Sequence, residues 1–185
     1  KIEDTVTIRG PGQDDLTIDA DSLSRVFWID DPSGTLSDPV FIEGMTLTGG
    51  NGGGVTITGN TSSLGGGLYS SGQLIIADSV ISNNLSYTGG GGLAFEPFLP
   101  EQLIIARTTI TGNTADGGGG LIVLGASASA TIFDSAVNDN TSAFSGGGIA
   151  FYNGGAATVT NTTIAGNTVT GASQQGGGIA IVSTA

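Results

Sequence analysis

The chain has 185 residues and a formal net charge of −12, which comes from 16 acidic and only four basic residues. Nucleic-acid binding is excluded, because contacts to phosphates need clustered Lys and Arg side chains. There is no Cys and no His, which excludes a disulfide framework, thiolate or imidazole metal sites and the familiar catalytic triads. No apolar run is long enough for a transmembrane helix.

The first 50 residues contain short segments that are rich in Ile, Val and Thr. Such segments, with apolar residues at every second position, indicate strands rather than helices. The expected strands cover residues 5–10, 16–20, 25–29 and 40–50. We expect residues 51–64 to form an extended turn or a compressed coil.

From residue 65 onward, three glycines followed by Leu or Ile recur five times, with spacings of 25, 28, 28 and 30 residues. The blocks cover residues 65–68, 90–93, 118–121, 146–149 and 176–179. A fixed period in this range is typical of a stacked solenoid. Helices are excluded, because each glycine would destabilise a helix by roughly 1 kcal/mol relative to Ala. Glycines instead permit positive φ and a close backbone turn where side chains would collide with the neighbouring coil.

A second block lies between successive glycine triplets and combines an apolar alternation with the ending Ile/Val-x-x-Asn. It occupies residues 74–84, 103–113, 130–140 and 157–167. A propeller blade would need about 40 residues, and a leucine-rich repeat would need a helical return. The pattern therefore predicts an all-β fold: a single-stranded, right-handed parallel β-helix of about seven coils. Residues 1–185 form one domain, with degenerate first coils in residues 1–50 and regular coils in residues 65–185.

Stacking of such coils predicts two columns of polar side chains. The first is an asparagine ladder in which each amide bonds to its neighbours one coil away, formed by Asn84, Asn113, Asn140 and Asn167. The second is an ion ladder in which Arg107 lies between Asp78 and Asp134. Arg107 is the only basic residue in the regular coils, so it is also the one candidate for a catalytic base. The neutral Asn161 at the fourth position of the column favours the ladder.

The glycine and asparagine blocks resemble the repeats of bacterial surface β-helix proteins. Residues 47–50, 65–72 and 74–84 with their later copies are most similar to the Gly-Gly-Ala-Ile and Phe-x-x-Asn repeats of chlamydial polymorphic outer-membrane proteins. Here Gly replaces Ala, and Ile or Val replaces Phe. The opening residues 6–19 look like the lead-in coil of similar exported proteins. The resemblance implies an extracellular, passenger-like stalk that serves in adhesion or as a structural surface element.

Acidic residues near the N-terminus are the only candidates for a cofactor site. Carboxylates in this segment can supply oxygen ligands for Ca²⁺, and the candidates are Asp14, Asp15, Asp19, Asp21, Asp30 and Asp31. None of them forms an EF-hand or a nonapeptide calcium repeat. The plainer interpretation is a solvated acidic surface without any cofactor.

Apolar side chains that point outward by alternation indicate a contact surface. Ile75 and Ile104 share such a face with Phe133, and adjacent exposed apolar residues can mark an interface. The inward apolar strand before Ala185 has no polar cap, which predicts either a segment of a longer protein or ends that pair with other subunits.

We therefore expect a non-enzymatic structural or adhesive element on a bacterial surface or outside the cell. Its expected partners are other protein subunits or surface glycans. Two alternatives stay open: a carbohydrate-active β-helix enzyme, and a subunit that stacks end to end into a filament or docks on a larger assembly.

Overall fold

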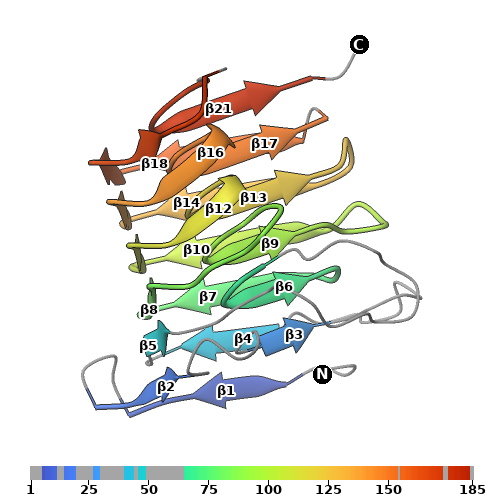
Figure 1. Cartoon of the computed structure of the whole chain (residues 1–185). Helices are drawn as coiled ribbons and strands as arrows, with labels where there is room; N and C mark the ends of the chain where they lie inside the picture. Colours follow the sequence, from blue (N-terminus) through green and yellow to red (C-terminus); the bar gives the residue numbers. More distant parts are fainter. Residues whose placement is uncertain are drawn as a thin grey trace.

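The computed structural model describes residues 6–11, 15–19, 27–29, 40–43, 46–48, 65–153, 155–172 and 175–183. In these residues the chain is all-β and winds into a parallel β-solenoid, without a helix (Figure 1). Each coil contributes one strand to each of three sheets, and strands of successive coils pair in parallel. No helix in the described part has the length and apolar character needed to cross a membrane.

Three sheets run the length of the stack. The first sheet contains β1 (Thr7–Arg9), β4 (Val40–Glu43), β7 (Leu74–Ala77), β10 (Gln102–Ala106), β14 (Ser129–Phe133) and β18 (Ala156–Thr160). The second contains β2 (Thr17–Asp19), β5 (Thr46–Thr48), β8 (Val80–Ser82), β11 (Thr109–Thr111), β15 (Ala136–Asn138) and β19 (Thr163–Ala165). The third contains β3 (Phe27–Ile29), β6 (Leu68–Ser70), β9 (Leu93–Phe95), β13 (Leu121–Leu124), β17 (Ile149–Tyr152) and β21 (Ile179–Val182).

Among the described residues, a fourth, shorter sheet joins the last three coils. It consists of β12 (Thr114–Gly117), β16 (Thr141–Ser145) and β20 (Thr168–Val169), which lie between the second and third sheets along the chain. Isolated bridges join the previous coil to this sheet at Leu85–Thr114 and Gly89–Gly117. These later coils therefore have four strands.

The described strands stack into six coils, so the expectation of about seven was wrong. That expectation assumed one repeat length throughout. Thr7 pairs with Phe41, which is 34 positions later, and Phe27 pairs with Leu68, 41 positions later. Residues in the later coils pair with partners 27 to 30 positions away. The first coils consume more sequence per turn, and the expected extended turn at 51–64 lies outside the described residues.

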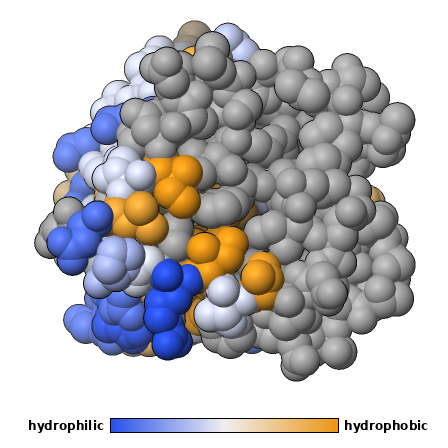
Figure 2. Space-filling view, turned by 90° about the horizontal axis from the view of Figure 1, so that it is seen from below, coloured by the Kyte–Doolittle hydropathy of each residue, from blue (hydrophilic) through white to orange (hydrophobic). Residues whose placement is uncertain are grey.

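The core is a set of apolar columns inside the coil. In β7, β10 and β14 of the first sheet the inward positions are buried, as at Ile76, Ile105 and Ile132, and the second and third sheets contribute matching columns. These are the residues that the alternation predicts to face inward. At the β1 end, Ile8 and Ile18 continue the columns as partly buried residues. Figure 2, which views the molecule from below, shows a group of hydrophobic residues (orange) beside hydrophilic ones (blue).

Each glycine of a triplet is needed for a different steric reason, as the triplet at residues 118–120 before β13 illustrates. Gly118 has φ +60°, a left-handed conformation that glycine adopts without strain. A Cβ at Gly119 would lie less than 3.0 Å from the backbone carbonyl oxygens of Gly147 and Thr141 in the next coil. A Cβ at Gly120 would lie 2.8 Å from the Gly148 carbonyl oxygen. The triplet therefore lets the chain turn and then lets two coils approach closely.

The corner between the first and second sheets is built in the same way in four coils. Its first residue has a left-handed backbone with φ between 47 and 51°, at Asp78, Arg107, Asp134 and Asn161. The next residue is Ser or Thr, and its hydroxyl donates to the carbonyl oxygen two residues earlier; the Thr108 Oγ1 to Ala106 oxygen distance is 2.9 Å. In addition, Ser135 Oγ accepts the Thr108 N–H at 3.1 Å. The hydroxyl therefore fixes both the corner and the stacking.

Candidate functional site

The four ladder asparagines lie in one column directly after the second sheet. Asn113 is fully buried, and both its backbone N–H and its Nδ2 donate to Oδ1 of Asn140, each at 3.0 Å. The same Nδ2 also donates to the Ile81 carbonyl oxygen at 3.0 Å. Asn84 and Asn140 repeat this pattern toward Asn113 and Asn167. The amides therefore satisfy each other and the backbone along the stack, which is a structural arrangement.

The corner column is exposed and carries an ion pair. Arg107 donates from Nε and Nη2 to the two carboxylate oxygens of Asp78 at 2.6 and 2.7 Å. The hydrogen bond from Arg107 lowers the pKa of Asp78 below its ordinary value, although desolvation opposes the shift. Asp134, one coil further on, accepts a hydrogen bond from Asn161 Nδ2. Arg107 thus has a structural partner in the adjacent coil.

The outward residues of the first sheet form the face that the alternation indicates. Ile75 and Ile104 are direct neighbours in adjacent strands, and Phe133 continues the parallel column through Ala106. All three side chains are half-buried. They form a small apolar strip on the side of the coil.

The calcium candidates fall mostly outside what the structure describes. Asp14, Asp21, Asp30 and Asp31 lie outside the described residues, as does the side chain of Asp19 at the end of β2. Asp15 is exposed in a turn. Among the described residues, no group of three or more acidic, His or Cys side chains is arranged to hold a metal ion.

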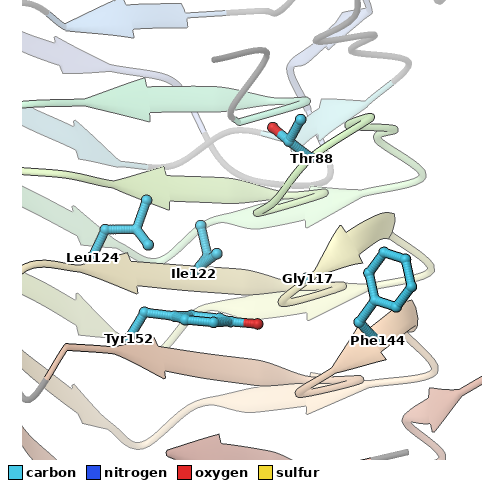
Figure 3. A pocket seen from close by; sticks show the side chains of 6 residues that line it. All are labelled: Thr88, Gly117, Ile122, Leu124, Phe144 and Tyr152. Atoms are coloured by element: carbon cyan, nitrogen blue, oxygen red, sulfur yellow. The ribbon is translucent and has the colours of Figure 1, made fainter. Parts of the chain in front are cut away.

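Within the described part of the chain, a groove on the outer face of the third sheet has the shape of a binding site. It has a volume of about 290 Å³. Its lining residues come from β12, β13, β16, β17 and the bend before the glycine triplet at residues 90–92. They are Thr88, Gly117, Ile122, Leu124, Phe144 and Tyr152. Figure 3 shows Ile122, Leu124 and Tyr152 on one side, with the Tyr152 hydroxyl pointing toward the side where Phe144 lies.

The groove forms where the ends of β12 and β16 come close to outward side chains of the third sheet. A Cβ at Gly117 would be 3.4 Å from the Tyr152 hydroxyl oxygen and 3.8 Å from Ile122 Cδ1. Tyr152 also shares a short hydrogen bond with Ser145 Oγ on β16. Phe144 on the same strand is 57 % exposed. The result is an apolar slot with two aromatic rings, one anchored and one open to solvent, and a few hydroxyl groups.

A carboxyl group lies on the same outer face of the third sheet. Glu96 follows β9, and its Oε2 accepts a hydrogen bond from the Tyr69 hydroxyl at 3.3 Å. Tyr69 packs in an outward cluster of buried residues with Ala94, Ile122 and Ala150. Burial raises the pKa of Glu96 above its ordinary value, and the Tyr69 hydrogen bond partly opposes this shift.

Neither the groove nor Glu96 was predicted from the sequence, although the sequence carries a signal for a covered outer face. The strands after the glycine triplets are apolar at outward as well as inward positions, as in 121–124 and 149–152. A strand with one solvated face alternates, whereas a strand covered on both faces does not. Loss of alternation here indicates that something covers the outer face.

The comparisons with known proteins identify no relative. No protein-family model, no curated protein and no solved structure matches the chain. The fold is therefore established by the geometry of the coils.

Proposed function

We propose that this chain is a non-enzymatic structural and adhesive element of a bacterial surface, akin to the chlamydial polymorphic outer-membrane repeats it resembles. The observation that carries the proposal is the unbroken asparagine column from Asn84 to Asn167, each amide bonded to the next. Together with the parallel sheets it makes successive coils one stiff stack. Such a stack suits a stalk that holds a contact surface away from a membrane.

The groove over β13 and β17 is the contact surface that we propose for adhesion. Apolar slots with a few polar groups are the usual form of small-ligand sites, and the open ring of Phe144 can stack on the apolar face of a sugar. The hydroxyls of Thr88 and Tyr152 supply hydrogen-bonding groups at its edges. Because the chain carries a net charge of −12, neutral glycans fit better than acidic ones.

The test is binding to an array of neutral and acidic oligosaccharides. We expect neutral saccharides to bind, and Phe144→Ala to weaken binding by about tenfold, because an aromatic contact is worth more than ~1 kcal/mol at a binding site. Tyr87→Ala is the matched control, since Tyr87 is 55 % exposed but does not line the groove. Equal loss in both variants, or no binding to any saccharide, would contradict the adhesive part of the proposal.

A carbohydrate-active enzyme is the second candidate, and Glu96 is the observation that favours it. A carboxyl group with a raised pKa can act as a general acid, and Glu96 shares the outer face with the groove. Incubation of the chain with the saccharides that bind, followed by an assay for new reducing ends, separates the two candidates. Turnover that Glu96→Gln abolishes while binding is kept would establish the enzyme instead.

A further inference from the structure

The last glycine triplet differs from the other four in what surrounds it. In the earlier triplets the coil that follows enforces the middle glycine. A Cβ there would lie less than 3.0 Å from the backbone of two residues in that next coil, as at Gly66, Gly91, Gly119 and Gly147. At Gly177 a Cβ would have its nearest neighbour, the carbonyl oxygen of Asn167, at 3.1 Å.

The third glycine of the last triplet differs from its counterparts in the earlier triplets in the same way. A Cβ at this position would lie 2.7 or 2.8 Å from a carbonyl oxygen of the next coil, at Gly67, Gly92, Gly120 and Gly148. A Cβ at Gly178 would meet Ile164 Cγ2 at 3.3 Å. Gly177 and Gly178 have no left-handed φ either, in contrast to Gly176. Within its own coil, the fifth triplet therefore requires its first glycine through φ, whereas a Cβ at the other two would meet only contacts that small shifts relieve.

In the same last coil, the side chains of the apolar columns are exposed. Ile181 is 77 % exposed, whereas Phe151 at the same column position one coil earlier is 2 % exposed. Ile179 and Val159 are also exposed at positions where the preceding coils are buried. The face formed by β18, β19, β20 and β21 thus combines an apolar centre with glycines shaped for close backbone approach.

We infer that this face receives one further coil of the same repeat, with an Ile/Val-x-x-Asn ending and a glycine triplet. The backbone after its asparagine packs against Gly177, as the backbone of Thr168 packs against Gly147. Its asparagine extends the ladder by accepting from Asn167, as Asn167 accepts from Asn140. Its apolar strands cover Ile179 and Ile181. This inference rests on the geometry of the repeat and is independent of the adhesive function.

The first coil of a second copy is a poor match for this face. Seven residues separate β2 from β3, and none of them is glycine. In the later coils, the connection from the second to the third sheet has nine to 13 residues and contains the triplet. These connections run from β8 to β9, β11 to β13, β15 to β17 and β19 to β21. The sequence of the first coil therefore lacks the triplet that a further coil of the repeat would bring to Gly177 and Gly178.

The test extends the chain after Val182 with a second copy of residues 153–182, which keeps the register because Val182 pairs with Tyr152. Stacked repeats add stability through each new interface, so we expect Tm to rise. Gly177→Ala should lower Tm by less than about 2 °C in the original chain and by roughly 5 to 10 °C in the extended chain. Gly147→Ala is the matched control and should lower Tm strongly in both.

A labelling experiment tests the face without relying on the glycine variants. The chain has no Cys, so Ile181→Cys provides a single thiol. We expect a thiol reagent to label it at least about tenfold more slowly in the extended chain, because covered groups react only through local opening. Tyr87→Cys, on an exposed turn in another coil, should be labelled equally fast in both chains.

Two results would overturn the inference. One is an equal effect of Gly177→Ala in the two chains, since the glycine would then serve its own coil. The other is self-association of the original chain, measured by sedimentation and abolished by Ile181→Asp, with no gain of stability on extension. A second copy would in that case be the occupant of the face.

Discussion

Two columns of polar side chains run along the stack, and they show how burial decides what a hydrogen bond contributes. In the asparagine column, Asn113 is fully buried and bonds to Asn84, Asn140 and the backbone of Ile81. In the corner column, Arg107 and Asp78 form a charged pair with side chains about half exposed. Water competes for the exposed pair but cannot replace the partners of the buried amides. The neutral column therefore stabilises the fold more than the charged one.

The same substitution placed in each column tests this comparison with the largest expected effect. Asn113→Asp removes the Nδ2 donor and buries a charge, which should destabilise the chain by about 3 to 5 kcal/mol at neutral pH. Asn161→Asp in the corner column is the matched control, and its exposed carboxylate beside Asp134 should cost less than about 1 kcal/mol. Urea unfolding followed by circular dichroism measures both.

The pH dependence of Asn113→Asp sharpens the result. Burial raises the pKa of the introduced carboxyl in the folded state. The variant should therefore regain stability as the pH falls below that folded-state pKa and lose it as the pH rises. Equal destabilisation in the two columns at every pH would show that burial does not separate them.

A change beside the buried column should have an intermediate effect. A Cβ at Gly120 would lie 2.8 Å from the Gly148 carbonyl oxygen and 3.0 Å from Asn140 Nδ2. Gly120→Ala should therefore push the ladder amide aside and destabilise the chain by about 1 to 3 kcal/mol, as overpacking does.

Gly117→Ala is the control for this change, because its Cβ would meet nothing closer than 3.4 Å. Thermal unfolding of the two variants should show a clear loss for Gly120→Ala alone. Similar losses would mean that the loss comes from replacing any glycine, regardless of the ladder.

The features that depend on stacking could be predicted from the sequence, because each coil repeats the same contacts. The inward columns, the asparagine ladder and the Asp78–Arg107 neighbours all follow from one alignment of the repeats. The coil number could not be predicted correctly, since the irregular first coils pair over 34 and 41 positions. The groove was also missed. It depends on how close Gly117 and Phe144 come to the outward side chains of β13 and β17, and the spacing of the repeat does not encode that distance.

The smallest expected effect belongs to the exposed pair. Arg107→Ala should lower the free energy of unfolding by about 0 to 1 kcal/mol, and added salt should reduce the difference because it screens exposed charges.

The pair should matter only above the pH at which Asp78 is protonated. Arg107 lowers the folded-state pKa of Asp78, so its stabilisation is present above the unfolded-state pKa and is lost as the pH falls through the folded-state value. Unfolding curves of the parent chain and Arg107→Ala should therefore converge in acid. A loss larger than that of Gly120→Ala would reverse the ranking of the two columns.

The most direct test of the buried column is hydrogen exchange of its side-chain amides, followed by NMR. If the amides of Asn113 and Asn140 bond within the stack as described, their Nδ2 protons should exchange only when the coils open, orders of magnitude more slowly than those of exposed Asn161. Exchange of all three at the rate of free amides, in a chain that is still folded, would contradict the account.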